Sequence, residues 1–138
     1  MSNERFLTQF DVSASALTSE RLQMRLIANN MANMNTTRTD DGGPYQRMEA
    51  IVQSRRLNEN SVDEGVSVAE IRRDDSPPRL VYNPHHPDAN AEGYVAYPNI
   101  DIVMETTRLK QAQLAYQANA TVIDNIKRTV NTALTLAD

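Results

Sequence analysis

The chain has 138 residues, 40% of them apolar and 5% aromatic, which suits one modest domain with a thin core. Eighteen acidic and fourteen basic residues give a formal net charge of −4, which disfavours nucleic acid or an anionic membrane as a partner. The absence of cysteine excludes disulfides, thiol catalysis and cysteine-based metal sites, and the four glycines form no nucleotide-binding loop.

The prolines and glycines divide the chain into three parts. All six prolines and all four glycines lie between residues 42 and 98, which permits a long helix on either side of that stretch. We therefore predict a mainly α fold with helical segments at 1–36 and 99–138 and a small irregular or β region at 37–98. No apolar run is long enough to cross a membrane, and the first residues lack the apolar stretch of a cleavable secretory signal.

The first predicted helix extends from about Phe10 to Asn35. Apolar side chains recur in it every seven residues, a spacing typical of coiled-coil packing. This predicted packing stripe consists of Phe10, Leu17, Met24 and Met31.

The end of this helix is unusually rich in asparagine. Asparagine is a mediocre helix former, and Asn29 and Asn33 are spaced to stack on one face. Amides between small residues can bond neighbouring helices and fix their register, whereas the alternative is that these residues simply end the helix. The candidate assembly motif comprises Ala28, Asn29, Asn30, Ala32, Asn33, Asn35 and Thr36.

The middle region contains four runs with strand character and no clear active site. The runs are 45–52, 65–71, 79–82 and 94–97. His85 and His86 are adjacent between two prolines, which favours a solvated loop over a metal site. Solvated turns are likewise favoured over a hydrolytic carboxylate pair for the three acidic pairs, Asp40 and Asp41, Asp63 and Glu64, and Asp74 and Asp75.

The last predicted helix extends from Asp101, a suitable N-cap, to Ala137. One heptad stripe, predicted to pack against the first helix in an antiparallel coiled coil, consists of Leu109, Tyr116, Ile123 and Val130. A second apolar face carries Leu114, Ala118 and Val122. One antiparallel partner cannot cover both faces, so this second face predicts contacts between subunits.

Residues 28–36 match the pattern A-N-N-x-A-N-x-N-T, and here the chain resembles the bacterial flagellar axial proteins, the family of rod, hook and hook-associated subunits. Residues 41–45 and 97–101, with the sequences DGGPY and YPNID, make it most similar to the basal-body rod subunits. The resemblance covers nearly the whole chain.

This resemblance implies a structural subunit of the proximal rod in the basal body. It implies export by the flagellar type III apparatus without signal cleavage, followed by polymerisation in the periplasm into a drive shaft that transmits torque and surrounds the export channel. The terminal helices would form an inner helical core domain, D0-like, and the middle a small outer region. The implied partners are copies of the chain, other rod subunits, basal-body ring and rod-base proteins and the export apparatus, with no cofactor and no enzymatic activity.

Two other functions fit the sequence less well. A soluble coiled-coil adaptor or oligomerisation protein would explain the heptad stripes without export, and predicts a closed small oligomer. An enzyme such as a cell-wall hydrolase would need an active site that the sequence does not display.

Overall fold

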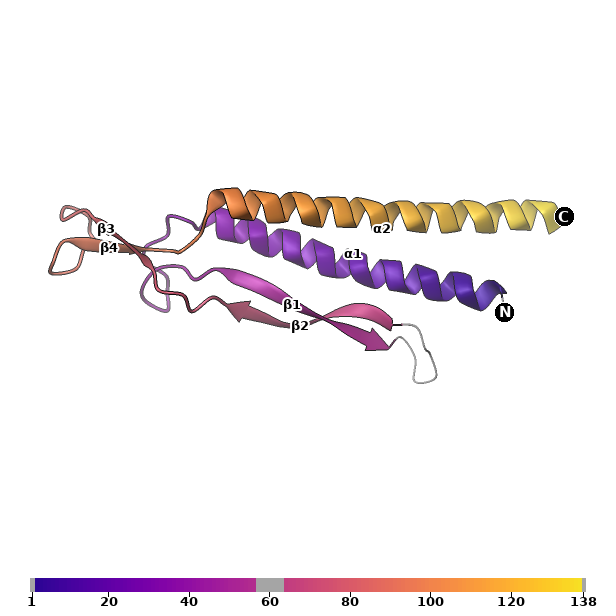
Figure 1. Ribbon diagram of the computed structural model, residues 1–138, viewed down its shortest axis with the longest axis horizontal. Coiled ribbons are helices and arrows are strands. Elements are labelled where there is room, and N and C mark those ends of the chain that lie inside the picture. The colour runs from indigo at the N-terminus through magenta and orange to yellow at the C-terminus, as the bar shows by residue number, and fades with distance from the viewer. Residues whose placement is uncertain (1, 57–63, 138) are drawn as a thin grey trace.

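The computed structural model describes residues 2–56 and 64–137. The two long helices are α1 (Ser2–Ala32) and α2 (Ile102–Ala137), and between them lie β1 (Met48–Arg56), β2 (Glu64–Arg73), β3 (Arg79–Tyr82) and β4 (Tyr94–Tyr97). The helices lie antiparallel, with both ends of the chain at one end of an elongated molecule (Figure 1). The predicted fold class, two long terminal helices with a small β middle, is confirmed.

The boundaries of the helices follow from local hydrogen bonds. α2 begins where predicted, because the Asp101 Oδ1 atom accepts hydrogen bonds from the backbone amides of Val103, at 2.8 Å, and Met104, at 3.2 Å. The predicted range of α1 was wrong at both ends, since the helix begins at Ser2 and ends at Ala32. Just past its end the Asn29 carbonyl accepts two hydrogen bonds from Asn33, one from the backbone amide, at 3.0 Å, and one from the side-chain amide, at 2.9 Å.

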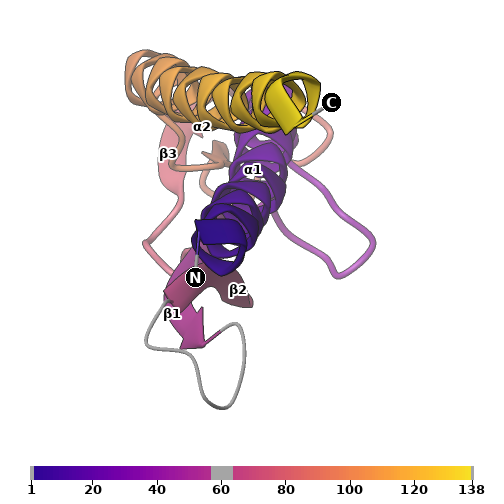
Figure 2. The ribbon, with the colours of Figure 1, turned by 90° about the vertical axis from the view of Figure 1, so that its right-hand side faces the viewer.

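α1 is the central element of the molecule. The antiparallel hairpin of β1 and β2 packs along one side of α1 and α2 packs along another (Figures 1 and 2). The Ser15 hydroxyl accepts a hydrogen bond from the Val66 amide, at 3.0 Å, and so ties β2 to the first half of the helix. A β-bulge lies between Ile51 and Val52, where the register of the hairpin shifts.

The apolar core is small and follows the contact between the two helices, from the last turns of α1 to beyond the middle of α2. Its buried members on the helices are Leu26, Ile27, Ala112, Ile123 and Ile126. The helices separate toward the ends of the chain (Figures 1 and 2), and there Leu7, Leu134 and Leu136 are exposed. The subunit alone therefore leaves the ends of its helices without a covering partner.

The predicted packing stripes are covered to different extents. Ile123 is buried, whereas Val130, one heptad nearer the end of α2, is 40% exposed. The half-buried members of the two stripes are Phe10, Leu17, Met24, Met31, Leu109 and Tyr116.

The hairpin of β3 and β4 forms the end of the molecule opposite the chain termini (Figure 1). The rings of Tyr82 and Tyr94 meet edge to face with centroids 5.3 Å apart, and the Arg79 guanidinium lies 5.7 Å from the centre of the Tyr97 ring. Gly93 adopts a positive φ of 85°, and a β-carbon there would lie 2.9 Å from Cε2 of Tyr82. Glycine is therefore required at this turn for both its backbone and its size.

We expect Gly93→Ala to lower the free energy of unfolding by about 2–3 kcal/mol, as left-handed backbone strain adds to the clash with Tyr82. Gly42→Ala is a matched control, because Gly42 has a φ of 80° but nothing within 4 Å of the added methyl group. Urea denaturation of both variants measures the difference. Equal losses for the two would mean that Tyr82 moves away freely.

Candidate functional site

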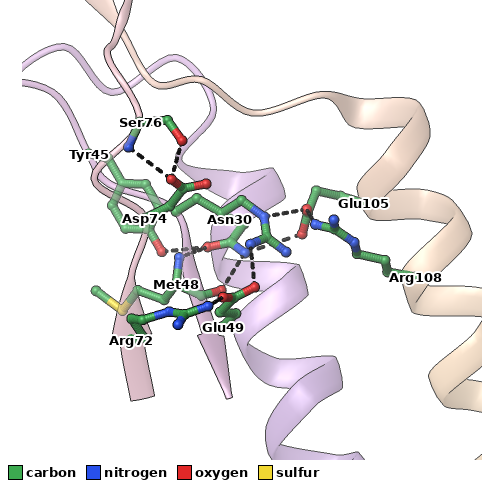
Figure 3. A network of polar contacts seen from close by, with 10 residues as sticks. Asn30, Tyr45, Met48, Glu49, Arg72, Asp74, Ser76, Glu105 and Arg108 are labelled. Atoms are coloured by element: carbon green, nitrogen blue, oxygen red, sulfur yellow. Dashed lines mark hydrogen bonds and ion pairs between the residues drawn. The ribbon is translucent and has the colours of Figure 1, made fainter. Parts of the chain in front are cut away.

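Asn30 lies at the point where α1, α2 and the β1 hairpin meet, and it is wholly buried. Its Nδ2 donates to the Met48 carbonyl, at 2.8 Å, and its Oδ1 accepts from the Met48 amide, at 2.9 Å. The same Oδ1 accepts from the Tyr45 hydroxyl at 3.0 Å (Figure 3). The side-chain amide thus pairs with both polar groups of one residue of β1, as a neighbouring strand would.

Glu105 connects this asparagine to α2. The side chain is 1% exposed and projects from the first turn of α2, where the positive end of the helix favours a carboxylate. Its Oε2 accepts from the Asn30 amide at 3.2 Å, and its Oε1 accepts from Arg47, at 2.7 Å, and Arg108, at 2.8 Å. One carboxylate therefore bonds to α1, to the segment before β1 and to α2 itself.

The ion pairs continue into the hairpin (Figure 3). Arg47 also contacts Glu49 at 3.1 Å, and Arg72 of β2 contacts the same carboxylate. Hydrogen bonds from Arg72 and Arg47 hold the pKa of Glu49 below its ordinary value. Among the described residues no buried side-chain nitrogen or oxygen lacks a partner, so this polar cluster is fully satisfied.

The structure divides the predicted assembly motif between two sides of α1. Asn30 points inward, whereas the exposed members are Ala28, Asn29, Ala32 and Asn35. Asn33 and Thr36 are half-buried, and the Thr36 hydroxyl donates to Oδ1 of Asn33 at 3.1 Å. Asn33 thus bonds within its own chain, whereas Asn29 is exposed and its side chain forms no hydrogen bond with another described residue.

Sequence reasoning missed Tyr45, Arg47 and Glu105 as members of the buried cluster. A signal for Glu105 was present, because it lies one heptad before Ala112 and three before Ile126, both buried. A charged residue at a core position of a helix predicts a buried ion pair. No comparable spacing identifies Arg47, which lies in an irregular segment.

The predicted second face of α2 is largely uncovered in the subunit. Leu114 is 67% exposed, Ala118 is exposed and Val122 is half-buried. At about 100° per residue, Leu114 and Ala118 lie on the side of α2 away from Ile123, so another molecule can reach this face without disturbing the pairing of the two helices.

The described residues contain no group of three His, Asp or Glu side chains able to hold a metal ion. The His86 Nδ1 atom accepts from the Asp88 amide at 3.0 Å within its own loop. Of the acidic pairs, Asp41 contacts Arg73 at 3.1 Å and Asp74 accepts from Ser76, while Asp63 lies outside the described residues. None of the helices described here is both long and apolar enough to cross a membrane.

Comparison with known proteins shows that the N-terminal and C-terminal parts of the chain both resemble flagellar basal-body rod proteins. Residues 10–38 match the family described as "Flagella basal body rod protein", and residues 91–136 match "Flagellar basal body rod FlgEFG protein C-terminal". The flagellar basal-body rod protein FlgC of Borreliella burgdorferi is 38% identical, with 94% of this chain and 95% of the relative covered. FlgC of Bacillus subtilis is also 38% identical, covering 90% and 93%, and that of Escherichia coli O6:H1 is 35% identical, covering 94% and 96%.

Proposed function

The chain belongs to the FlgC family and is a structural subunit of the flagellar basal-body rod, and from this premise we propose that it polymerises into the proximal, periplasmic part of a torque-transmitting shaft around the export channel. The observation that carries the proposal is the uncovered apolar surface of two long paired helices. The second face of α2 and the separated helix ends are exposed in the subunit, and contact with neighbouring subunits would cover them.

In this proposal residues 1–36 and 99–138 form a D0-like helical core and residues 37–98 a small outer region. The neighbours are copies of the chain, other rod subunits, and the ring and rod-base proteins. The chain reaches the periplasm through the flagellar type III apparatus without signal cleavage, and it acts by assembly rather than catalysis. The buried cluster of Asn30, Glu105 and Arg47 supports such a role, because it fixes the angle at which the helices and the hairpin are presented to neighbours.

Deletion of the coding sequence, followed by complementation, tests this function. We expect loss of swimming and of complete basal bodies, with both restored by the intact chain. The chain should be present in purified basal bodies with its first residues retained. A soluble adaptor would instead sediment as a closed small oligomer at all concentrations and be absent from basal bodies.

We expect Ala118→Glu to give a chain that is made and exported but does not build a rod. The carboxylate would lie unpaired in an apolar contact, at a cost of several kcal/mol repeated at every subunit. Swimming and the yield of basal bodies are the measurements. Gln117→Glu is the matched control, because it adds the same charge at an exposed position that is already polar. Normal swimming of Ala118→Glu cells, with the variant present in basal bodies, would show that this face is solvent-exposed in the rod.

A further inference from the structure

A groove of about 440 Å³ lies between α1, α2 and the start of β1. Its floor is apolar and includes Leu26, Ile27 and Ala112, all buried. Its rim is polar and includes Glu20, Gln23 and Arg108. An apolar floor with a charged rim is the surface expected of a site that receives another protein.

Glu20 is the charged group of this groove whose interactions are incomplete. Arg47, Arg108 and Glu49, which also line it, all take part in the ion pairs described above. Glu20 is half-buried on α1, and no other described residue forms a hydrogen bond or ion pair with it. Burial raises the pKa of its carboxyl above the ordinary value, so a cation arriving at the groove would stabilise the charged form.

The opposite face of α1 carries the complementary charge. Arg21, Arg25, Ala28 and Ala32 are exposed and recur every three or four residues, so they form one stripe along the helix. Neither arginine forms an ion pair with any residue that the structure describes. The alanines, which are the outward members of the assembly motif, would allow a second molecule to approach closely.

The groove and this stripe face in different directions on the same helix. Each residue of an α-helix turns by about 100°, which places Glu20, Gln23 and Ile27 on one side of α1 and Arg21, Arg25 and Ala28 on roughly the opposite side. A contact between groove and stripe is therefore heterologous. Such contacts continue from one subunit to the next instead of closing into a symmetric dimer.

We propose that the groove between α1, α2 and β1 receives the exposed stripe of α1 from a second copy of this chain, with Glu20 pairing with Arg21 and Arg25 of that copy and the floor covered by its Ala28 and Ala32. This proposal rests on the proposed function as a rod subunit. In this contact Ala28 and Ala32, the exposed alanines of the assembly motif, would pack against a neighbouring subunit.

Disulfide cross-linking tests the contact directly, because the native sequence has no cysteine. A full-length chain with Gln23→Cys and Ala28→Cys should form a ladder of covalent multimers in oxidised basal bodies. The two cysteines cannot join within one chain, since they lie on opposite sides of one helix. The matched control pairs Gln23→Cys with Gln117→Cys, an exposed position on the polar side of α2, and should form no ladder.

Charge exchange provides a second measurement. Glu20→Arg alone, and Arg21→Glu with Arg25→Glu, should each reduce incorporation into basal bodies about tenfold or more, because like charges would meet in the contact. All three changes together should restore incorporation to within about threefold of the native level. Arg21 and Arg25 are exposed, so the urea midpoint of the variant with Arg21→Glu and Arg25→Glu should equal that of the native subunit.

The outcomes separate this proposal from the proposed function. If the native chain is present in basal bodies but the cysteine pair gives no ladder, or the combined exchange is no better than the single changes, the groove does not receive this stripe. If the native chain is absent from basal bodies, the function as a rod subunit fails, and this contact fails with it.

Discussion

Asn30→Ala is expected to lower the free energy of unfolding of the isolated subunit by about 3–4 kcal/mol. The change removes four hydrogen bonds and leaves the amide and carbonyl of Met48 without these partners in a partly buried place. The Glu105 carboxylate also loses a donor. Urea denaturation followed by circular dichroism measures the loss, and amide exchange at Met48 should show that β1 detaches from α1.

The adjacent Asn29 offers a matched control for this prediction. Its side chain is exposed, so Asn29→Ala should change the stability of the subunit by less than about 0.5 kcal/mol. If Asn29 instead contacts a neighbouring subunit, its replacement should reduce motility without altering the urea midpoint. Equal stability of the two variants would contradict the role assigned to Asn30.

Glu105→Ala is expected to destabilise the subunit by about 3–5 kcal/mol, because the nearly buried guanidinium of Arg47 then loses its principal carboxylate. Arg108 contributes less to this loss, since its side chain is 42% exposed and water can replace the carboxylate. Glu105→Gln keeps an acceptor oxygen and should lose about half as much. The measurement is again the urea midpoint at neutral pH.

A double variant separates the loss of the Glu105 contacts from the cost of leaving the buried charge of Arg47 without its carboxylate. Glu105→Leu with Arg47→Met removes both buried charges and should recover most of the stability that Glu105→Leu alone loses, as replacement of whole buried ion pairs does elsewhere. Glu92→Ala, at an exposed position in the loop before β4, is the control for loss of a carboxylate alone. A double variant as unstable as the sum of the single changes would show that the ion pair does not couple these residues.

Changes in the buried cluster and changes on the exposed helix faces should impair assembly in different ways. The buried cluster fixes the relative positions of α1, α2 and the β1 hairpin, whereas the exposed faces of the helices are available to neighbours. Variants at Asn30 and Glu105 should therefore lower the amount of folded subunit. Variants at Ala118 or Arg25 should leave a folded subunit that fails to assemble.

Much of the fold was predictable from single residues. The positions of the prolines and glycines confine the long helices to the two ends, and Asp101 caps α2 as predicted. β3 and β4 have the predicted bounds and β2 is slightly longer than its predicted run, but β1 begins three residues and ends four residues later than the predicted run 45–52. The start of α1 was not predictable from the apolar stripe, because residues 2–9 precede its first member. Nothing in those residues prevents a helix from extending through them.

The candidate site was only partly predictable. The asparagine-rich segment at the end of α1 and the two apolar faces of α2 could be read from the residues alone, since local propensity and periodicity depend only on neighbouring residues. The burial of Asn30, rather than Asn29 or Asn33, and its pairing with Glu105, 75 residues away, depend on how the chain packs. Periodicity relates the faces of one helix to each other, but which face is covered depends on where distant elements pack. Here the hairpin packs on a second side of α1, and so a polar residue there found its partners in another part of the chain.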